Sequence, residues 1–178
     1  MYLIVGLGNP EADYDKTRHN MGFHVVNRLA KEYDIELSRN KFNGIFGTGI
    51  IEGEKVILLK PQTFMNSSGE SIIEYKNFYK LKNENILIIY DDIDLEPGAV
   101  RIRKKGGPGT HNGMKSVVHF LNTDEFPRVR VGIGMPGLDV ELIEHVIGAV
   151  SDEEWKILDE GTRKSWKSSN RNSKKWDR

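Results

Sequence analysis

The sequence of 178 residues contains no cysteine. Thiol nucleophiles, thiolate-bound metals and disulfides are therefore excluded from its chemistry. It also has no apolar run near the ~20 residues that a membrane-spanning helix needs. The first twenty residues lack the basic start and the sustained apolar stretch of a secretion signal. We therefore expect no membrane partner, and the lack of cysteine is compatible with a cytosolic location.

Several catalytic motifs are also missing. The sequence has no GxSxG nucleophile elbow, no HExxH zinc motif and no GxxxxGKS/T phosphate loop. The glycine motif Gly6–Glu11 lacks the third glycine of a dinucleotide fingerprint, and Pro10 removes an amide donor. A hydrolase with this sequence would therefore use water as its nucleophile, and a side chain would have to activate that water.

The net charge is zero but unevenly distributed. Residues 161–178 carry seven basic residues and one acid, which leaves a net charge of −6 on the first 160 residues. A basic end of this kind suggests contact with a polyanion. For the tail alone, a solvated terminus is the simpler interpretation.

The pattern of apolar residues predicts a single α/β domain, since 178 residues suit one hydrophobic core. Short apolar runs at residues 2–5 and 86–90 indicate buried strands. Residues 42–51 and 54–59 resemble a β-hairpin, which makes the sheet mixed rather than parallel. We further expect strands at 99–103 and 128–133 and helices at 21–33, 69–81, 113–121, 140–147 and 152–166. Alternating strands and helices are typical of a layered α/β fold.

His19 is the candidate group for activating water, because a histidine titrates near neutral pH. It follows the first strand, and Asp91 stands at the carboxyl end of the second apolar strand. Ligands of α/β folds bind beside these strand ends. A His–Asp pair there would be the orienting half of a catalytic triad, with water replacing serine. The pattern alone favours the plainer interpretation, in which His19 caps a helix and Asp91 starts a turn.

Asn9, Asn66 and Asn112 each fall in a loop signal after an element. Asparagine offers two donors and one acceptor without charge, which suits an ester carbonyl or an oxyanion. Each alone is more often a turn or cap residue. His111 beside Asn112 is more specific, because the pair precedes a helix and presents both side chains at one crossing. The remaining histidines are interpreted as structural.

Basic residues gather on the 99–103 strand and beyond it. They are Arg101, Arg103, Lys104 and Lys105, with Arg128 and Arg130 further on. Arg101 and Arg103 alternate with apolar residues and so share one strand face. Such a face could hold a nucleic-acid backbone, because phosphate contacts supply much of nucleic-acid affinity. A solvated strand face is the alternative.

Five segments together resemble one family. They are Val5–Pro10, the run from Tyr14 through Thr17-Arg18-His19-Asn20 to Val26, Lys60–Gly69, Asp91–Gly98 and Gly107–Ser116. In this order and spacing they are similar to the signatures of bacterial-type peptidyl-tRNA hydrolases, over nearly the whole chain. Asn27 and Thr110 depart from the family pattern, and Pro108 stiffens the same loop as Thr110. Thr110 and Pro108 leave the mobility of the glycine-rich loop and tRNA docking open.

The resemblance implies hydrolysis of the ester that joins a peptide to the terminal ribose of tRNA. It makes His19 the general base and Asp91 its support, with Asn9 and Asn112 positioning the carbonyl, the water or the oxyanion. Substrate-binding positions implied by it are Tyr14, Met65, Asn66 and His111. Positions implied to bind tRNA are Arg103, Lys104, Lys105 and Arg130.

The resemblance also implies a single three-layer domain over residues 1–178, with a twisted mixed sheet between helices on both faces. The basic C-terminal helix or tail would occupy about 161–178, and a mobile lid would span about 135–148. The family implies no metal, no cofactor and a cytoplasmic monomer. Two alternatives stay open: a non-catalytic RNA-binding relative that keeps the basic surface, and a metal-assisted esterase.

Overall fold

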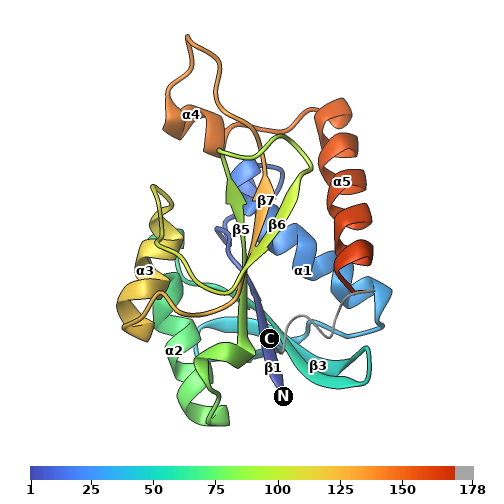
Figure 1. The fold of residues 1–178 in the computed structure, drawn as a ribbon, viewed down its shortest axis with the longest axis vertical. Helices are drawn as coiled ribbons and strands as arrows, with labels where there is room; N and C mark the ends of the chain where they lie inside the picture. Colours follow the sequence, from blue (N-terminus) through green and yellow to red (C-terminus); the bar gives the residue numbers. More distant parts are fainter. Residues whose placement is uncertain (171–178) are drawn as a thin grey trace.

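The computed structural model describes the backbone of residues 1–170 and the side chains of residues 1–163. Within these residues the chain forms a seven-stranded sheet in the order β2-β3-β4-β1-β5-β7-β6 (Figure 1). The strands are β1 (Tyr2–Gly6), β2 (Arg39–Lys41), β3 (Gly44–Ile51), β4 (Glu54–Pro61), β5 (Ile86–Asp92), β6 (Val100–Arg103) and β7 (Arg128–Gly132). The helices are α1 (Met21–Glu32), α2 (Ser68–Tyr79), α3 (Asn112–Leu121), α4 (Leu142–Ile147) and α5 (Asp152–Asn170). Four 3-10 turns are η1 (Ala12–Tyr14), η2 (Arg18–Asn20), η3 (Met65–Ser67) and η4 (Asn83–Asn85).

The sheet is mixed, as the sequence predicts. Strands β4, β1, β5 and β7 run parallel in its centre, whereas β2 and β3 at one edge and β6 at the other pair antiparallel. The central strands are buried on both faces, which explains why β1 and β5 have continuous apolar sequences rather than alternating ones. The carboxyl ends of the parallel strands meet at one edge of the sheet, and the loops that follow them can form a site there.

Helices cover both faces, so the predicted three-layer fold is confirmed. In Figure 1, α2 and α3 lie on one side of the sheet and α1 and α5 on the other. Leu3, Val5 and Ile88 face the α2/α3 layer, and Ile4 and Ile89 face the α1/α5 layer. Alternate residues of each strand thus contribute to two separate cores.

Most predicted elements lie within one to four residues of their expected bounds. The three-residue strand β2 was not predicted, and α5 runs to Asn170, beyond the expected end at 166. The last part of the basic tail, residues 171–178, lies outside the described residues. No helix in residues 1–170 is long and apolar enough to cross a membrane.

Candidate active site

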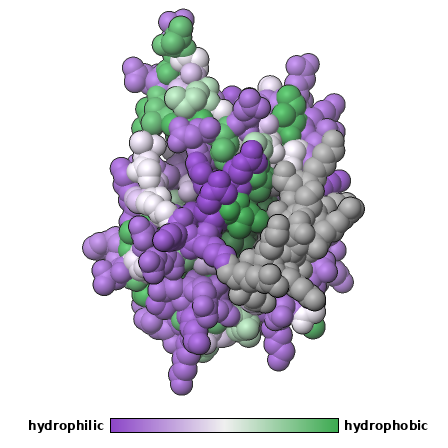
Figure 2. All heavy atoms as spheres, in the orientation of Figure 1, coloured by the Kyte–Doolittle hydropathy of each residue, from purple (hydrophilic) through white to green (hydrophobic). Residues whose placement is uncertain are grey.

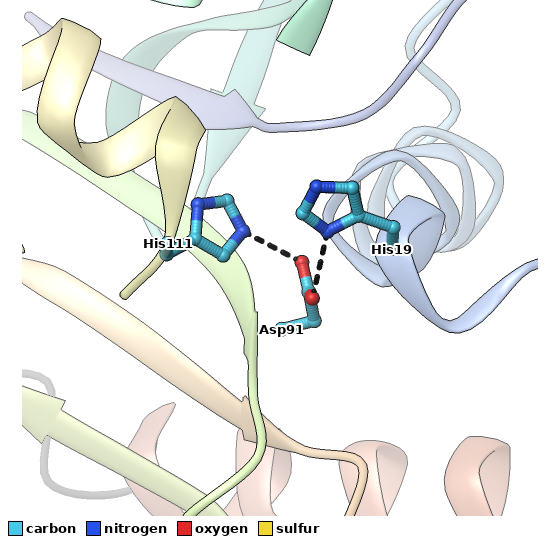
Figure 3. Close-up of side chains that lie close together, drawn as sticks. All are labelled: His19, Asp91 and His111. Atoms are coloured by element: carbon cyan, nitrogen blue, oxygen red, sulfur yellow. Dashed lines mark hydrogen bonds and ion pairs between the residues drawn. The ribbon is translucent and has the colours of Figure 1, made fainter. Parts of the chain in front are cut away.

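Three side chains from distant parts of the chain meet at the carboxyl end of β5 (Figure 3). The Nδ1 atom of His19 lies 2.9 Å from Oδ2 of Asp91, and Nε2 of His111 lies 2.8 Å from Oδ1 of the same carboxylate. The Asp91 side chain is only 2% exposed. The expected His19–Asp91 pair is therefore present, and a second imidazole shares its carboxylate.

Close packing of α1 against the sheet brings His19 to this place. His19 lies in η2, which runs directly into α1. Gly22, in the first turn of α1, touches the sheet so closely that a Cβ there would collide with the backbone of Leu7 and Ile89. Asp91 follows Ile89 by two residues in β5. A glycine at position 22 thus lets the histidine approach the carboxylate.

Asn20 fixes the loop after β1. It is 1% exposed, its Oδ1 accepts from the Asn9 N–H at 2.8 Å, and its Nδ2 donates to the Asn9 carbonyl at 2.9 Å. The Asn9 side chain in turn accepts from the Glu11 N–H at 3.1 Å. The sequence pattern does not single out Asn20, although this residue belongs to the segment that contains His19. A buried asparagine next to a candidate base was the available signal.

The hydrogen bonds around Asp91 indicate which ring nitrogens of His19 and His111 carry protons. Burial raises the pKa of Asp91, but the adjacent His111 and His19 outweigh it, and the net pKa lies well below its ordinary range. The ionised carboxylate can only accept, so both histidine nitrogens that touch it carry protons. Nδ1 of His111 also accepts from the Met114 N–H at 3.2 Å, as the cap of α3. His111 is thereby held as the neutral Nε2–H tautomer.

His19 is arranged differently. Its Nδ1–H donates to Asp91, so its lone pair is on Nε2. Burial lowers the pKa of His19, but the charge and hydrogen bond of Asp91 overcome this effect and raise it above 6.5. The side chain remains 16% exposed. His19 therefore combines an accessible lone pair with a partner that stabilises its protonated form.

A cleft of about 620 Å³ opens beside these groups. Its lining includes the expected site residues His19, Asp91, Arg103, Lys105, His111, Asn112 and Arg130. Leu142, Ile143 and Val146 of α4 line another wall. Figure 2 shows apolar residues gathered on the projecting segment around α4. The expected lid region thus borders the cleft.

Other expected site residues lie outside the lining of this cleft. They are Asn9, Tyr14, Met65, Asn66 and Lys104. Met65 is buried in the α2/α3 core at 5% exposure, and the next residue, Asn66, is exposed. A direct substrate contact is therefore more accessible to Asn66 than to Met65.

The four arginines of β6 and β7 share one face of the sheet but differ in environment. Arg101 pairs with Arg130 and Arg103 with Arg128 in the antiparallel register. Arg103 is exposed, and Nε of Arg130 lies 2.6 Å from Oδ2 of Asp92. Asp92 raises the pKa of Arg130, so this cation stays charged.

Arg128 corrects the sequence analysis. It is 1% exposed and donates to the carbonyls of Gly106, Asp124 and Phe126. Placing it with the candidate phosphate ligands was wrong, because the 104–110 loop and the chain before β7 cover it. Its guanidinium satisfies buried backbone carbonyls and holds the start of the glycine-rich loop.

The same three groups could ligate a cation, since ligand atoms of His19, Asp91 and His111 lie within 4.8 Å of one another. With Asp91 ionised, both histidine nitrogens that lie against it donate to the carboxylate. A metal ion would have to displace both protons and break both hydrogen bonds. The geometry therefore fits proton transfer better than metal coordination.

The fold and this site define an α/β hydrolytic enzyme, in which a carboxylate supports a histidine beside a cleft. Comparison with known proteins gives its family. The family model for peptidyl-tRNA hydrolase matches residues 3–174. Peptidyl-tRNA hydrolase of Caldanaerobacter subterraneus subsp. tengcongensis is 54% identical over 165 residues, which are 93% of this chain and 89% of that protein. The chain belongs to the peptidyl-tRNA hydrolase family.

Two further relatives agree. Peptidyl-tRNA hydrolase of Clostridium beijerinckii is 54% identical over 167 residues, which are 94% of this chain and 86% of the relative. The crystal structure of peptidyl-tRNA hydrolase from Acinetobacter baumannii matches with a TM-score of 0.84 at 44% identity. That match covers 89% of this chain and 81% of the other. The predicted fold and family are both confirmed.

Proposed function

We propose that this enzyme hydrolyses the ester between peptide and tRNA in peptidyl-tRNA, with His19 as general base. The observation that carries the proposal is the 2.9 Å contact between Nδ1 of His19 and the Asp91 carboxylate, because an Nδ1–H that donates there leaves the lone pair on Nε2. We infer the substrate from membership of the family and the mechanism from the residues of the site. The enzyme would free tRNA from stalled or dropped-off translation in the cytoplasm.

The proposed reaction has two proton transfers. Nε2 of His19 takes a proton from water as the water oxygen attacks the ester carbonyl, and Asp91 stabilises the imidazolium that forms. Asn9 and Asn112 position the carbonyl and donate to the oxyanion. The tetrahedral intermediate then collapses, the bond to the ribose oxygen breaks, and His19 returns the proton to that oxygen. The products are a free tRNA hydroxyl and the peptide carboxylic acid, which gives its proton to solvent and leaves as a carboxylate.

The remaining expected residues have binding roles in this proposal. Asn66, supported by Met65, and Tyr14 would hold the peptide and the ribose end, and His111 would keep Asp91 oriented while bordering the substrate. The candidate tRNA contacts are Arg103, Lys104, Lys105 and Arg130. Their charge supports the assignment, because phosphate binding depends on such cations. We propose that the enzyme works as a monomer.

The test is release of tRNA from N-acetyl-aminoacyl-tRNA in the presence of EDTA, comparing the wild type with His19→Ala. We expect cleavage by the wild type and loss of turnover in the variant, with tRNA binding retained. Equal loss of binding would make His19 a docking residue instead. A folded wild type that binds tRNA without cleaving it would favour the RNA-binding alternative. Activity abolished by EDTA and restored by a metal would favour the metal-assisted esterase.

A further inference from the structure

Arg18 connects the segment that carries His19 to two helices far along the chain. Its Nε and Nη2 atoms form a two-pronged ion pair with Glu154 of α5, at 2.8 and 2.7 Å. Its Nη1 donates to the carbonyls of His145 at 3.0 Å and Gly148 at 3.5 Å. These carbonyls end α4, where a cation is favourable. One guanidinium thus joins η2, α4 and α5.

The backbone beside Arg18 makes the same connection. The Val150 N–H donates to the Lys16 carbonyl at 2.9 Å, and Thr17 forms an isolated antiparallel bridge with Ala149. Residues 16–18 therefore pair with the connection between α4 and α5, which Figure 1 shows passing over the end of the sheet. The chain that leaves the cleft wall is attached directly before the candidate base.

The Arg18 contacts are partly shielded from water. Its side chain is 16% exposed, and that of Glu154 is 24% exposed. A bidentate guanidinium–carboxylate pair has a fixed geometry, unlike the looser contact of a lysine. Glu154 also lies in the first turn of α5, where an acid is favoured. Orientation, as well as charge, therefore depends on this pair.

The proposal rests on the function proposed above for His19. We propose that Arg18 is a positioning residue, which sets the placement of His19 and couples it to the α4 wall of the cleft. The segment η2 is a single 3-10 turn, and such a turn has little stiffness of its own. Asp91 holds the His19 ring at Nδ1, and Arg18 holds the backbone from which the ring projects.

This arrangement links substrate binding to the base. Leu142, Ile143 and Val146 line the cleft, and the carbonyls at the end of the same helix bind Arg18. A substrate that displaces α4 would move Arg18, and through the backbone it would move His19. Misplacement of a catalytic group by about 1 Å can cost about a hundredfold in rate.

The experiment compares Arg18→Lys with Arg28→Lys. Arg28 is the matched control: its side chain is 15% exposed and joins α1 to α5 through Asp159 at 2.8 Å, and its hydrogen bonds among the described residues go to Asp159 rather than to η2 or α4. Both changes keep the positive charge and replace a guanidinium by an ammonium group. Arg18→Lys removes a two-pronged contact, whereas Arg28 binds Asp159 through Nη1 alone. We expect Arg18→Lys to lower kcat about tenfold or more, with a smaller change in KM. Arg28→Lys should leave kcat near that of the wild type.

The pH profile separates positioning from general stability. The pKa of His19 is raised by its contact with Asp91, so a loosened contact moves the acid limb of kcat/KM to lower pH. Arg18→Lys should shift the acid limb in this direction, and Arg28→Lys should not. Since Arg18→Lys keeps the positive charge, such a shift would come from the altered position of His19 and not from a lost charge. Glu154→Gln keeps the Arg18 contacts to α4 and should give a smaller change in the same direction. Thermal unfolding of each variant measures the stability loss.

An unchanged kcat and acid limb in Arg18→Lys would overturn the proposal and leave Arg18 a structural tie between helices. Equal losses in Arg18→Lys and Arg28→Lys would do the same. A wild type that does not cleave N-acetyl-aminoacyl-tRNA would instead overturn the proposed function itself. Arg18→Gln together with Glu154→Gln gives a coupling energy, and additive losses would show that the pair does not act as one unit.

Discussion

Changing Asp91 to asparagine tests the centre of the site with almost no change in shape. The carboxylate accepts from His19 at 2.9 Å and from His111 at 2.8 Å. An amide has one acceptor oxygen and one NH2 group, so one imidazole N–H would face another donor. The variant therefore loses a negative charge and one of two buried hydrogen bonds.

The size of the effect follows from the charge. Two unit charges about 4 Å apart interact by about 4 kcal/mol at an effective dielectric constant of about 20. Loss of that interaction when the His19 imidazolium forms corresponds to about 10³-fold in rate. A wrong tautomer in a comparable His–Asp pair costs about 10⁴-fold. We expect kcat for Asp91→Asn to fall by about 10³- to 10⁴-fold, with KM little changed.

Steady-state release of tRNA from N-acetyl-aminoacyl-tRNA measures both constants. Asp92→Asn is the neighbouring control, because Asp92 contacts Arg130 at 2.6 Å rather than either histidine of the site. It should alter KM at most. A kcat for Asp91→Asn equal to that of the wild type would refute the reasoning and make Asp91 a structural cap.

Three further predictions concern the tRNA surface and pH. Arg103→Ala combined with Arg130→Ala should raise KM and make the logarithmic salt dependence shallower by about 1.5, and an unchanged slope would remove both from the tRNA site. The raised pKa of His19 places the acid limb of wild-type kcat/KM above pH 6.5, and a limb below that value would contradict it. The lowered pKa of Asp91 contributes stability above pH about 3.8 that is lost as the pH falls through the folded value. The acid-induced drop in wild-type Tm should therefore be smaller in Asp91→Asn.

The fold was predictable because burial leaves a direct mark on sequence. Continuous apolar residues in β1 and β5 indicate strands covered on both faces, and the glycine-punctuated β3–β4 hairpin indicates an antiparallel edge. Strand β2 left no such mark. It consists of Arg39, Asn40 and Lys41, which are not fully buried, and its place comes from pairing with β3 rather than from its own side chains.

The proximity of His19 and Asp91 was predictable from the topology of the sheet. His19 lies in the connection after β1, and Asp91 is the second-to-last residue of β5. These parallel strands are neighbours, so their carboxyl ends meet at one edge of the sheet. The second histidine could not be placed in this way. Its contact with Asp91 depends on the path of the glycine-rich loop before α3, which no periodicity specifies. The burial of Arg128 likewise depends on that loop.

His19 and His111 share the Asp91 carboxylate, but they differ in which ring nitrogen is free to accept a proton. The cap of α3 occupies Nδ1 of His111, so His111 must donate through Nε2 and has no free lone pair. His19 donates through Nδ1 and keeps its lone pair on Nε2. If the roles were exchanged, His111 would lose its cap bond before it could accept a proton from water. The hydrogen bonds of an ordinary helix start therefore support the proposed assignment of His19, rather than His111, as the base.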